Sequence, residues 1–308
     1  MATSGELLCN DLTKVYRRSR GGRALDSVTM RVPSHGIFAL IGRNGAGKTT
    51  LVRILATELE PTSGSASING MDVMKEARRL RERIAIVPQE ARTIPWLTAG
   101  QTVLSYLLWR GFSYAEARSR AGEALAKVGI EKHENTLNRL LSGGVKRKVL
   151  VATVLASEAE IVFLDEPTTG LDPISRRELW QTLTEISNDR FVVLTTHYLE
   201  EAEQLAGMIG VLNEGRLVGL GTLDQLRGMI KYQYSIMLAS GGAAPQLSDG
   251  IVNVGSDGQV QVLTTEEEAH RLSKQLLEGG SRFTMSRVSI NDVFFHLVKG
   301  TSDGADVP

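Results

Sequence analysis

The chain has 308 residues and a mass of 33.5 kDa, which at about 150 residues per domain predicts two domains with room for a sizeable core. Its content of 42% hydrophobic and 23% charged residues is typical of a folded globular protein and excludes disorder except at the chain ends. The 35 Lys and Arg residues balance 35 Asp and Glu residues, so no overall positive field draws the protein onto nucleic acid or anionic lipid. No nucleic-acid partner is therefore expected.

The sequence shows no sign of secretion or of a membrane span. Cys9 is the single cysteine and cannot form an internal disulfide, and the N-terminal segment lacks the basic and apolar regions of a signal peptide. A membrane span needs about 18 apolar residues in succession. The nearest candidate, residues 93–109, is uncharged but contains polar residues, and its apolar residues have helical spacing on one face. We expect a cytosolic protein in which this helix packs on the core or meets another protein.

The chain begins with two predicted strands, residues 7–16 and 24–32, joined by an arginine-rich turn at 17–23 that is most simply a solvated loop. Further on, short apolar runs of the kind found in buried parallel strands alternate with helical stretches. These runs are residues 37–41, 84–87, 161–164 and 191–194. Buried strands separated by helices predict a doubly wound α/β sheet.

Residues 97–132 have helical periodicity and predict an all-helical insertion, taken as about residues 90–148. Within it, Ser113 and Glu116 form a capping box, and Gly129 ends the helix that follows. The pattern changes after residues 219–221. Strands are predicted at 232–238, 251–254, 259–263 and 282–288, and helices at 265–277 and 290–299. We therefore expect a first domain of residues 1–221, an α+β domain of residues 222–299 and a flexible tail of residues 300–308.

A phosphate-binding motif, G-x-x-x-x-G-K-[ST], lies between the predicted strand at 37–41 and a predicted helix at 48–56. Glycines allow successive N–H groups to point at a phosphate, and the start of the helix adds partial positive charge. Lys48 supplies a full charge to the β- and γ-phosphates, and Thr49 can ligate magnesium. The predicted ATP-binding residues here are Gly42, Arg43, Asn44, Gly45, Ala46, Gly47, Lys48, Thr49 and Thr50.

Two acidic residues and a histidine follow other predicted strands of the same sheet. Asp165 can hold hydrated magnesium, and Glu166 can polarise a water molecule for attack on the γ-phosphate. His197 follows the strand at 191–194, so it reaches the same edge of the sheet, where a γ-phosphate contact is favoured over a structural role. Together with the phosphate-binding loop, these residues predict nucleotide hydrolysis.

Between the loop and the acidic strand lies a second candidate anion site, Ser142-Gly143-Gly144, at the start of a helix. In this position the tripeptide resembles the signature motif of ABC ATPases, and the resemblance extends from about residue 7 to residue 221. It implies a P-loop NTPase of the ABC ATPase type, with an antiparallel β subdomain and a helical insertion, followed here by a small C-terminal α+β domain. Glu166 would then be the catalytic glutamate and His197 the switch histidine.

The resemblance also implies roles for residues that carry no motif of their own. Tyr16 lies where the family places an aromatic residue that stacks on adenine, and Gln89 resembles the glutamine that contacts magnesium and the attacking water. Magnesium would be held by Thr49 and Gln89, and by Asp165 through water. Two such domains dimerise head to tail, so that Ser142, Gly143, Gly144 and Asp172 would contact the ATP of the opposite subunit. The implied ligands are ATP and Mg²⁺.

One position departs from the family pattern, because Val145 replaces the usual glutamine after Ser-Gly-Gly. A polar contact near the ribose is lost, while the hydroxyl and amides of the signature remain. Residues 166–173, 195–197 and 292–294 resemble the subgroup that powers ABC-2-type exporters, which includes sodium-efflux and drug-export ATPases.

The resemblance implies an ATP-hydrolysing subunit that closes on a second copy or a homologous ATPase subunit around two ATP-Mg. It would drive substrate export through separate integral membrane permease subunits, at the cytoplasmic face of the cell membrane. The alternative is a soluble ABC ATPase that acts in an assembly process without transport. The long coiled coil of DNA-repair members and the tandem cassettes of translation members are both absent from this sequence.

Overall fold

The computed structural model describes residues 5–16, 22–238, 247–254 and 259–302. Most of the expected arginine-rich turn (17–21) and the end of the expected tail (303–308) lie outside the described residues. The chain divides into two units, Met1–Leu220 and Gly221–Pro308. None of the described helices is long and apolar enough to cross a membrane.

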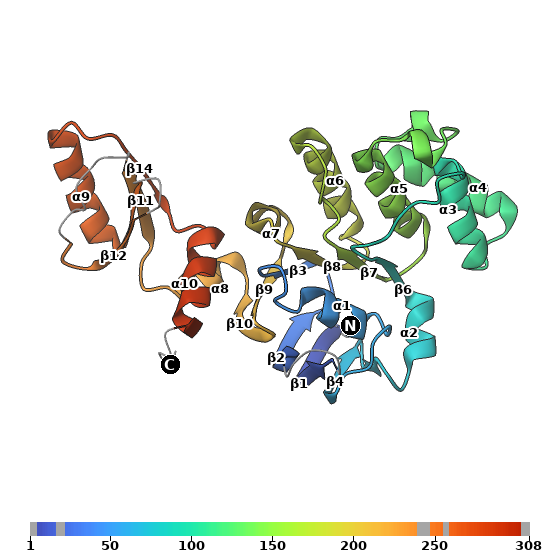
Figure 1. Ribbon diagram of the computed structural model, residues 1–308, viewed down its shortest axis with the longest axis horizontal. Coiled ribbons are helices and arrows are strands. Elements are labelled where there is room, and N and C mark those ends of the chain that lie inside the picture. Colours follow the sequence, from blue (N-terminus) through green and yellow to red (C-terminus); the bar gives the residue numbers. More distant parts are fainter. Residues whose placement is uncertain (1–4, 17–21, 239–246, 255–258, 303–308) are drawn as a thin grey trace. The chain divides into compact units, whose positions relative to one another are not determined.

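The first unit is built on a six-stranded sheet in the order β10-β9-β3-β8-β7-β6 (Figure 1). The strands are β3 (Ile37–Ile41), β6 (Ile84–Val87), β7 (Ile161–Asp165), β8 (Phe191–Thr196), β9 (Met208–Asn213) and β10 (Arg216–Gly221). β9 pairs with β3, β3 with β8, β8 with β7 and β7 with β6, and each of these pairs is parallel. The four strands predicted from apolar runs all lie in this sheet, and the α/β fold class is confirmed.

Side chains of this sheet alternate between two cores. Ile37, Val192 and Leu194 face a core that they share with α3, α4, α5 and α6. Phe38 and Leu40 face a second core that contains α1 and the N-terminal sheet. Because successive side chains of a strand point to opposite faces, a fully apolar run is what a sheet covered on both sides requires.

An antiparallel sheet of order β2-β1-β4-β5 covers the second core. Its strands are β1 (Glu6–Val15), β2 (Arg23–Pro33), β4 (Ser63–Ile68) and β5 (Met71–Asp72). Helix α1 (Lys48–Leu55) packs between the two sheets, and α2 (Ala77–Arg83) leads into β6. Cys9 is fully buried in β1, and burial raises the pKa of its thiol to about 12, so the thiol is inert.

Helices cover the other face of the central sheet, where Figure 1 shows α3, α4 and α5 grouped beyond β6. They are α3 (Ala99–Trp109), α4 (Tyr114–Lys127), α5 (Gly143–Ala156), α6 (Pro173–Ile186) and α7 (Leu199–Leu205), with short 3₁₀ helices at Glu131–His133 and Asn138–Leu140. The capping box of Ser113 and Glu116 is formed as predicted, and Gly129 has a φ of 68°. Helix α5 runs eight residues beyond the expected end of the insertion at residue 148.

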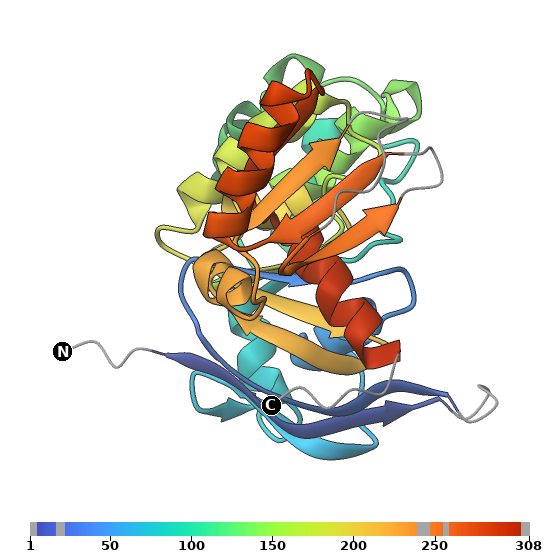
Figure 2. The same cartoon turned by 90° about the vertical axis from the view of Figure 1, so that its left-hand side faces the viewer.

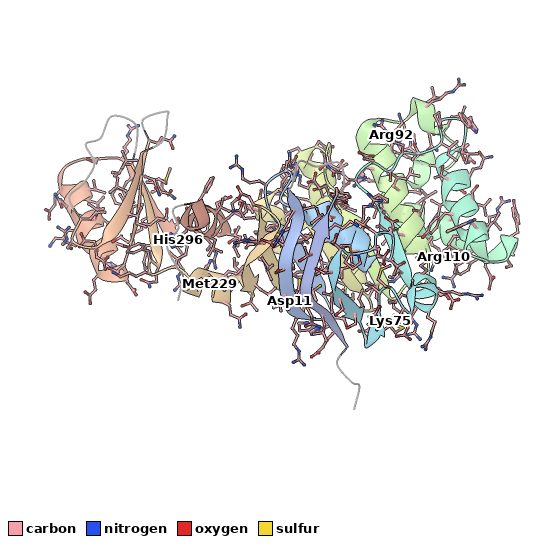
Figure 3. The ribbon with its side chains drawn as sticks, turned by 60° about the horizontal axis from the view of Figure 1, so that its bottom comes forward. Asp11, Lys75, Arg92, Arg110, Met229 and His296 are labelled. Carbon is pink, nitrogen blue, oxygen red and sulfur yellow. The ribbon has the colours of Figure 1, made fainter. Side chains whose placement is uncertain are left out.

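An arginine links the helical insertion to the central sheet. Arg110, labelled in Figure 3, follows α3 and donates through Nη1 to the main-chain oxygen of Ile84 at 2.7 Å and through Nη2 to that of Glu82 at 3.0 Å. The uncharged helix α3 itself buries Ala99, Val103 and Leu107 in the core.

The second unit is a four-stranded antiparallel sheet in the order β12-β13-β11-β14 with helices. Its elements are α8 (Leu223–Gly228), β11 (Tyr234–Leu238), β12 (Gly250–Val254), β13 (Val260–Thr264), α9 (Glu266–Glu278), β14 (Phe283–Arg287) and α10 (Ile290–Ser302). Figure 2 shows α9 lying along one face of the sheet, where Ala269 and Leu272 pack on Ile236 and Val262. The expected tail start at residue 300 is wrong, because α10 continues to Ser302.

Candidate nucleotide-binding and hydrolytic site

The phosphate-binding motif forms the loop between β3 and α1, where two glycines adopt conformations that other residues rarely take. Gly45 and Gly47 have φ values of 83° and 106°. A Cβ added to Gly47 would lie 2.3 Å from the main-chain oxygen of Ala24, so no other residue fits there. Gly47 is the N-cap of α1 and offers no side chain to its first N–H groups. These amides and the positive end of α1 therefore form an anion-binding site.

Lys48, the first residue of α1, is buried inside this loop. Its Nζ donates to the main-chain oxygens of Gly42 at 2.8 Å and Arg43 at 3.3 Å, and lies 3.8 Å from Glu166 Oε1. Burial lowers the pKa of Lys48, and the charges of Glu166 and Asp165 act against that shift. The loop thus holds an ammonium group close to the carboxylates on the neighbouring strand.

Glu166 stands at the carboxyl end of β7 in a left-handed backbone conformation, with φ of 51°. Its N–H donates to both the main-chain oxygen and Oγ1 of Thr195, each at 3.1 Å. The Thr195 hydroxyl in turn donates to Asp165 Oδ1. A single threonine of β8 therefore fixes the positions of both acidic residues. Its hydrogen bonds offset the cost of the left-handed backbone conformation of Glu166, which is about 1–3 kcal/mol.

Polar side chains from two other segments and from its own turn meet the carboxylate of Glu166. Gln89, after β6, donates from Nε2 to Oε2 at 3.3 Å, and the Thr169 hydroxyl donates to the same oxygen at 3.2 Å. His197, after β8, places Nδ1 3.2 Å from Oε2. The structure thus brings the three expected catalytic residues, Glu166, Gln89 and His197, together at one edge of the sheet. A carboxylate held in this way is oriented to accept a proton from water.

Two cavities meet at Gln89 and Glu166. One, of about 370 Å³, is lined by Ala24, Asn44, Gly45, Gly47, Lys48, Thr49, Thr50, Gln89 and Glu166. The other, of about 440 Å³, reaches from the same Gln89 and Glu166 to the start of α5 and includes Gly143 and Lys146. The expected loop residues Gly42, Arg43 and Ala46 do not line the first cavity. They fix the loop backbone, as in the hydrogen bond from Ala46 N to Arg43 O at 3.1 Å.

The residues expected to contact the opposite subunit lie apart from the phosphate-binding loop of their own chain. Ser142 is the N-cap of α5 and accepts from Val145 N at 3.3 Å, and Asp172 is the N-cap of α6. A Cβ added to Gly144 would lie 3.2 Å from Leu171 Cδ2, so the two helix starts are neighbours. Neither Ser142 nor Asp172 lines the cavity at the phosphate-binding loop.

Tyr16 lies beside the loop rather than in it. Its hydroxyl is 3.3 Å from Thr50 Oγ1, and its side chain is 37% exposed. A ring in this position can be reached by a base bound next to the loop. Of the residues expected to hold magnesium, Thr49 lies exposed at the start of α1, whereas Asp165 is buried, with 1% of its surface exposed.

Two residues of the site were missed in the sequence. Thr195 lies in the segment 195–197 that resembles the exporter subgroup, but the resemblance assigns it no role, and the pairing of β7 with β8 places it opposite Asp165. Arg147 lies in the run Lys146-Arg147-Lys148, which has the appearance of a solvated basic helix face, yet Arg147 and Lys148 are 9% and 4% exposed. Its position on the helix that begins with the signature is the sequence feature that could have pointed to Arg147.

The sequence profile of the family described as ABC transporter matches residues 25–169, which include the phosphate-binding loop, Gln89, the signature and Glu166. The chain is 38% identical over 220 residues to the daunorubicin/doxorubicin resistance ATP-binding protein DrrA of Streptomyces peucetius, covering 71% of this chain and 66% of that protein. It is 35% identical over 287 residues to the daunorubicin resistance ATP-binding protein DrrA3 of Streptomyces coeruleorubidus, covering 89% of this chain and 91% of that one.

A solved structure with a similar fold is the ATP-binding cassette MJ0796 in a dimeric post-hydrolysis state bound to ADP and Pi. It superposes with a TM-score of 0.65 at 27% identity and covers 70% of this chain and 98% of that one. The likeness extends the family match from sequence to the arrangement of the central sheet and its helices.

Proposed function

The chain belongs to the ABC transporter family as one of its ATP-hydrolysing cassettes, and we propose that it closes head to tail on a second cassette around two ATP-Mg and drives export through separate membrane subunits. The observation that carries the hydrolytic part is the meeting of Lys48, Gln89 and His197 at the carboxylate of Glu166. This arrangement supplies charge for the phosphates and a base for the attacking water at one point.

Each residue around Glu166 has a separate part in hydrolysis. Lys48 exchanges its two main-chain hydrogen bonds for the β- and γ-phosphates, which leaves its charge where negative charge develops. Glu166 accepts a proton from the water that attacks the γ-phosphorus. Gln89 and His197 keep its carboxylate in place and can donate to the water and the γ-phosphate.

The residues present fit a magnesium ion of the kind that accompanies ATP. Such an ion needs only one or two protein ligands, because water and phosphate oxygens complete its coordination. Thr49 and Gln89 line the cavity at the loop, and the buried carboxylate of Asp165 lies nearby, oriented by Thr195. We assign Thr49 and Gln89 as direct ligands and Asp165 as a ligand through water. When bound, the ion neutralises charge on the β- and γ-phosphates.

A second cassette would complete the site. Ser142, Gly143 and Gly144 stand at the start of α5 with free amides of a helix N-terminus, yet they lie apart from the loop of their own chain. Head-to-tail pairing would bring them and Asp172 to the nucleotide held by the other chain. The dimeric state of the similar cassette MJ0796 supports this pairing. Whether the second cassette is a copy or a homologue does not change the geometry required.

Exposed apolar side chains of the helical insertion support a membrane partner. Trp109 at the end of α3 is 82% exposed, and Trp96 before α3 is 74% exposed, while Leu140 is 70% exposed. Trp96 and Leu140 lie on neighbouring segments, joined by the hydrogen bond from Arg139 N to Pro95 O at 3.0 Å, and large exposed apolar residues mark interaction surfaces. We place this surface against permease subunits, with the chain held peripherally at the cytoplasmic face. The relatives named for daunorubicin resistance support a drug molecule as the exported substrate.

Copurification tests the transport part of this proposal. The full chain carrying an affinity tag is isolated from detergent-solubilised membranes, and the accompanying integral membrane protein is identified and assayed for effects on ATP hydrolysis. We expect a membrane protein in stoichiometric amount that stimulates hydrolysis. A chain found only with soluble assemblies would favour the alternative of a non-transport ATPase, and would leave the hydrolytic site intact.

A further inference from the structure

Arg147 of α5 is a buried cation that contacts two functional loops at once. Its Nη2 donates to the main-chain oxygens of Asp165 at 2.5 Å and Glu166 at 2.9 Å, and its Nε donates to that of Pro167 at 3.2 Å. Its Nη1 donates to the main-chain oxygens of Pro88 at 3.3 Å and Gln89 at 3.5 Å. One guanidinium therefore joins the turn that carries Glu166 to the loop that carries Gln89.

These contacts use the particular shape of arginine. The guanidinium has five N–H donors in a planar fork, and in the described part of the chain its hydrogen bonds all go to main-chain oxygens. Burial lowers the pKa of Arg147, and the charges of Asp165 and Glu166 act against that shift. Carbonyl oxygens satisfy its N–H groups without neutralising the charge, so the charge remains to act on the two carboxylates.

Arg147 is also placed on the helix that begins with the signature. Ser142 caps α5, and Arg147 lies five residues later, about one and a half turns along the same helix. Because α5 moves as a rigid element, a displacement of its start also displaces Arg147, and Arg147 transmits the displacement to both loops. The larger cavity, which Arg147 lines together with Gly143, Gln89 and Glu166, is the space bounded by these three segments.

We propose that Arg147 is a positioning residue that couples the signature helix of a subunit to the Glu166 turn and the Gln89 loop of the same subunit. The proposal rests on the proposed function, since the signature must engage nucleotide for the coupling to be used. When a partner's ATP draws in the start of α5, Arg147 carries both loops with it and sets the carboxylate of Glu166 for attack at the subunit's own site. ATP binding itself does not require Arg147, because it lies outside the cavity at the phosphate-binding loop.

The test compares full-length Arg147→Met and Arg147→Lys with the wild type and with Lys148→Met. Lys148 is the matched control, since it is also buried on α5 but pairs with Glu178 of α6 at 2.6 Å and not with either loop. Three quantities are measured: kcat for ATP hydrolysis, ATP affinity by direct binding, and hydrogen exchange of peptides covering residues 88–91 and 165–169.

For Arg147→Met we expect kcat to fall by about 10-fold to 100-fold, because small displacements of a catalytic group have effects of this size. ATP affinity should stay within about 3-fold, and exchange should become faster in both loops but not in the central sheet. Arg147→Lys should recover part of kcat, since an ammonium group can reach some of the carbonyls but not all. Lys148→Met should leave both loops unchanged.

The proposal is overturned if Arg147→Met keeps kcat within about 3-fold of the wild type. It is also overturned if kcat, ATP affinity and exchange protection of the whole sheet are lost together, which shows a role in folding only. Should Arg147→Met fail to fold, Arg147→Lys decides by the same criteria. Hydrogen exchange is also measured without nucleotide. A wild-type chain that lacks ATPase activity would refute the proposed function, and the exchange data would still show whether Arg147 links the two loops.

Discussion

Gln89 Nε2 donates to Glu166 Oε2 at 3.3 Å, and these two residues form the boundary between the cavity at the phosphate-binding loop and the cavity at the signature helix. They come from the ends of β6 and β7, which are adjacent parallel strands. A ligand or substitution that moves this pair from one cavity therefore also changes the shape of the other cavity.

Lys48→Ala should abolish ATP hydrolysis or reduce it by about 100-fold or more, since the ammonium is the charge held nearest to the phosphate-binding loop and the Glu166 carboxylate. Steady-state hydrolysis of the assembled complex is the measurement. Lys75→Ala is the control, because Lys75 is exposed on the antiparallel side of the unit (Figure 3). Wild-type activity in Lys48→Ala would refute the assignment of the loop.

His197→Ala should lower kcat by about 100-fold with a much smaller effect on KM for ATP, because His197 contacts Glu166 and does not line the cavity at the phosphate-binding loop. A variant that loses ATP affinity and retains kcat would place His197 in binding and not in hydrolysis. His133→Ala, a change in a 3₁₀ helix of the insertion, provides the control.

Glu166→Gln should bind ATP and hydrolyse it about 100-fold to 10,000-fold more slowly, since the amide keeps the shape of the side chain but is a poor base. Because nucleotide would no longer be consumed, a dimer held by ATP-Mg should accumulate, and ADP should not sustain it. Light scattering after gel filtration measures the mass, and tightly bound ATP per chain is measured in the same fractions. If Glu166→Gln hydrolyses ATP at the wild-type rate, Glu166 is not the base.

Glu201 predicts a pH dependence of stability. It is fully buried on α7, where the Thr168 hydroxyl and Trp180 Nε1 donate to its carboxyl group at 3.1 Å and 3.0 Å. Burial raises the pKa of Glu201 above its ordinary value of 4.5, against the effect of these hydrogen bonds. A raised folded-state pKa means that stability is fully present below pH 4.5 and is lost as the pH rises through the folded-state pKa.

The measurement is Tm of the wild type and Glu201→Gln between pH 4.5 and pH 8. The wild type should lose stability relative to Glu201→Gln as the pH rises, because the amide has no charge to bury. A difference in Tm that does not change with pH would contradict the assignment of a raised pKa to Glu201.

Much of the central sheet could be predicted because strands buried on both faces are continuous apolar runs. β3 and the first four residues of β7 are unbroken runs of this kind, and the motifs that follow them could be placed at one edge of the sheet. β4 escaped prediction because its sequence, SGSASI, consists mainly of small polar residues and takes its place through pairing with β1. α6 does carry a local signal, since Asp172 caps it and Pro173 occupies its first turn.

The contacts of the site were harder to predict than its members. The sequence places Glu166 after a strand but does not show that Thr195 holds its backbone or that Arg147 spans two loops. Both depend on which strands are adjacent and on which face of α5 is buried. A basic residue in a basic run gives no local sign of burial, because the same letters fit a solvated helix face.

In the proposed head-to-tail dimer, Lys48 of one chain and Ser142 of the other hold each ATP. The most direct measurement is hydrolysis by mixtures of Lys48→Ala and Ser142→Arg chains. Homodimers of either variant have two defective sites, whereas a mixed dimer has one site with both intact parts. Mixing two inactive chains should therefore restore activity, highest at equal amounts and roughly a quarter of the wild-type rate if the sites act independently. Mixtures that remain inactive at every ratio, although dimers exchange subunits, would contradict the claim, as would full activity of Ser142→Arg alone.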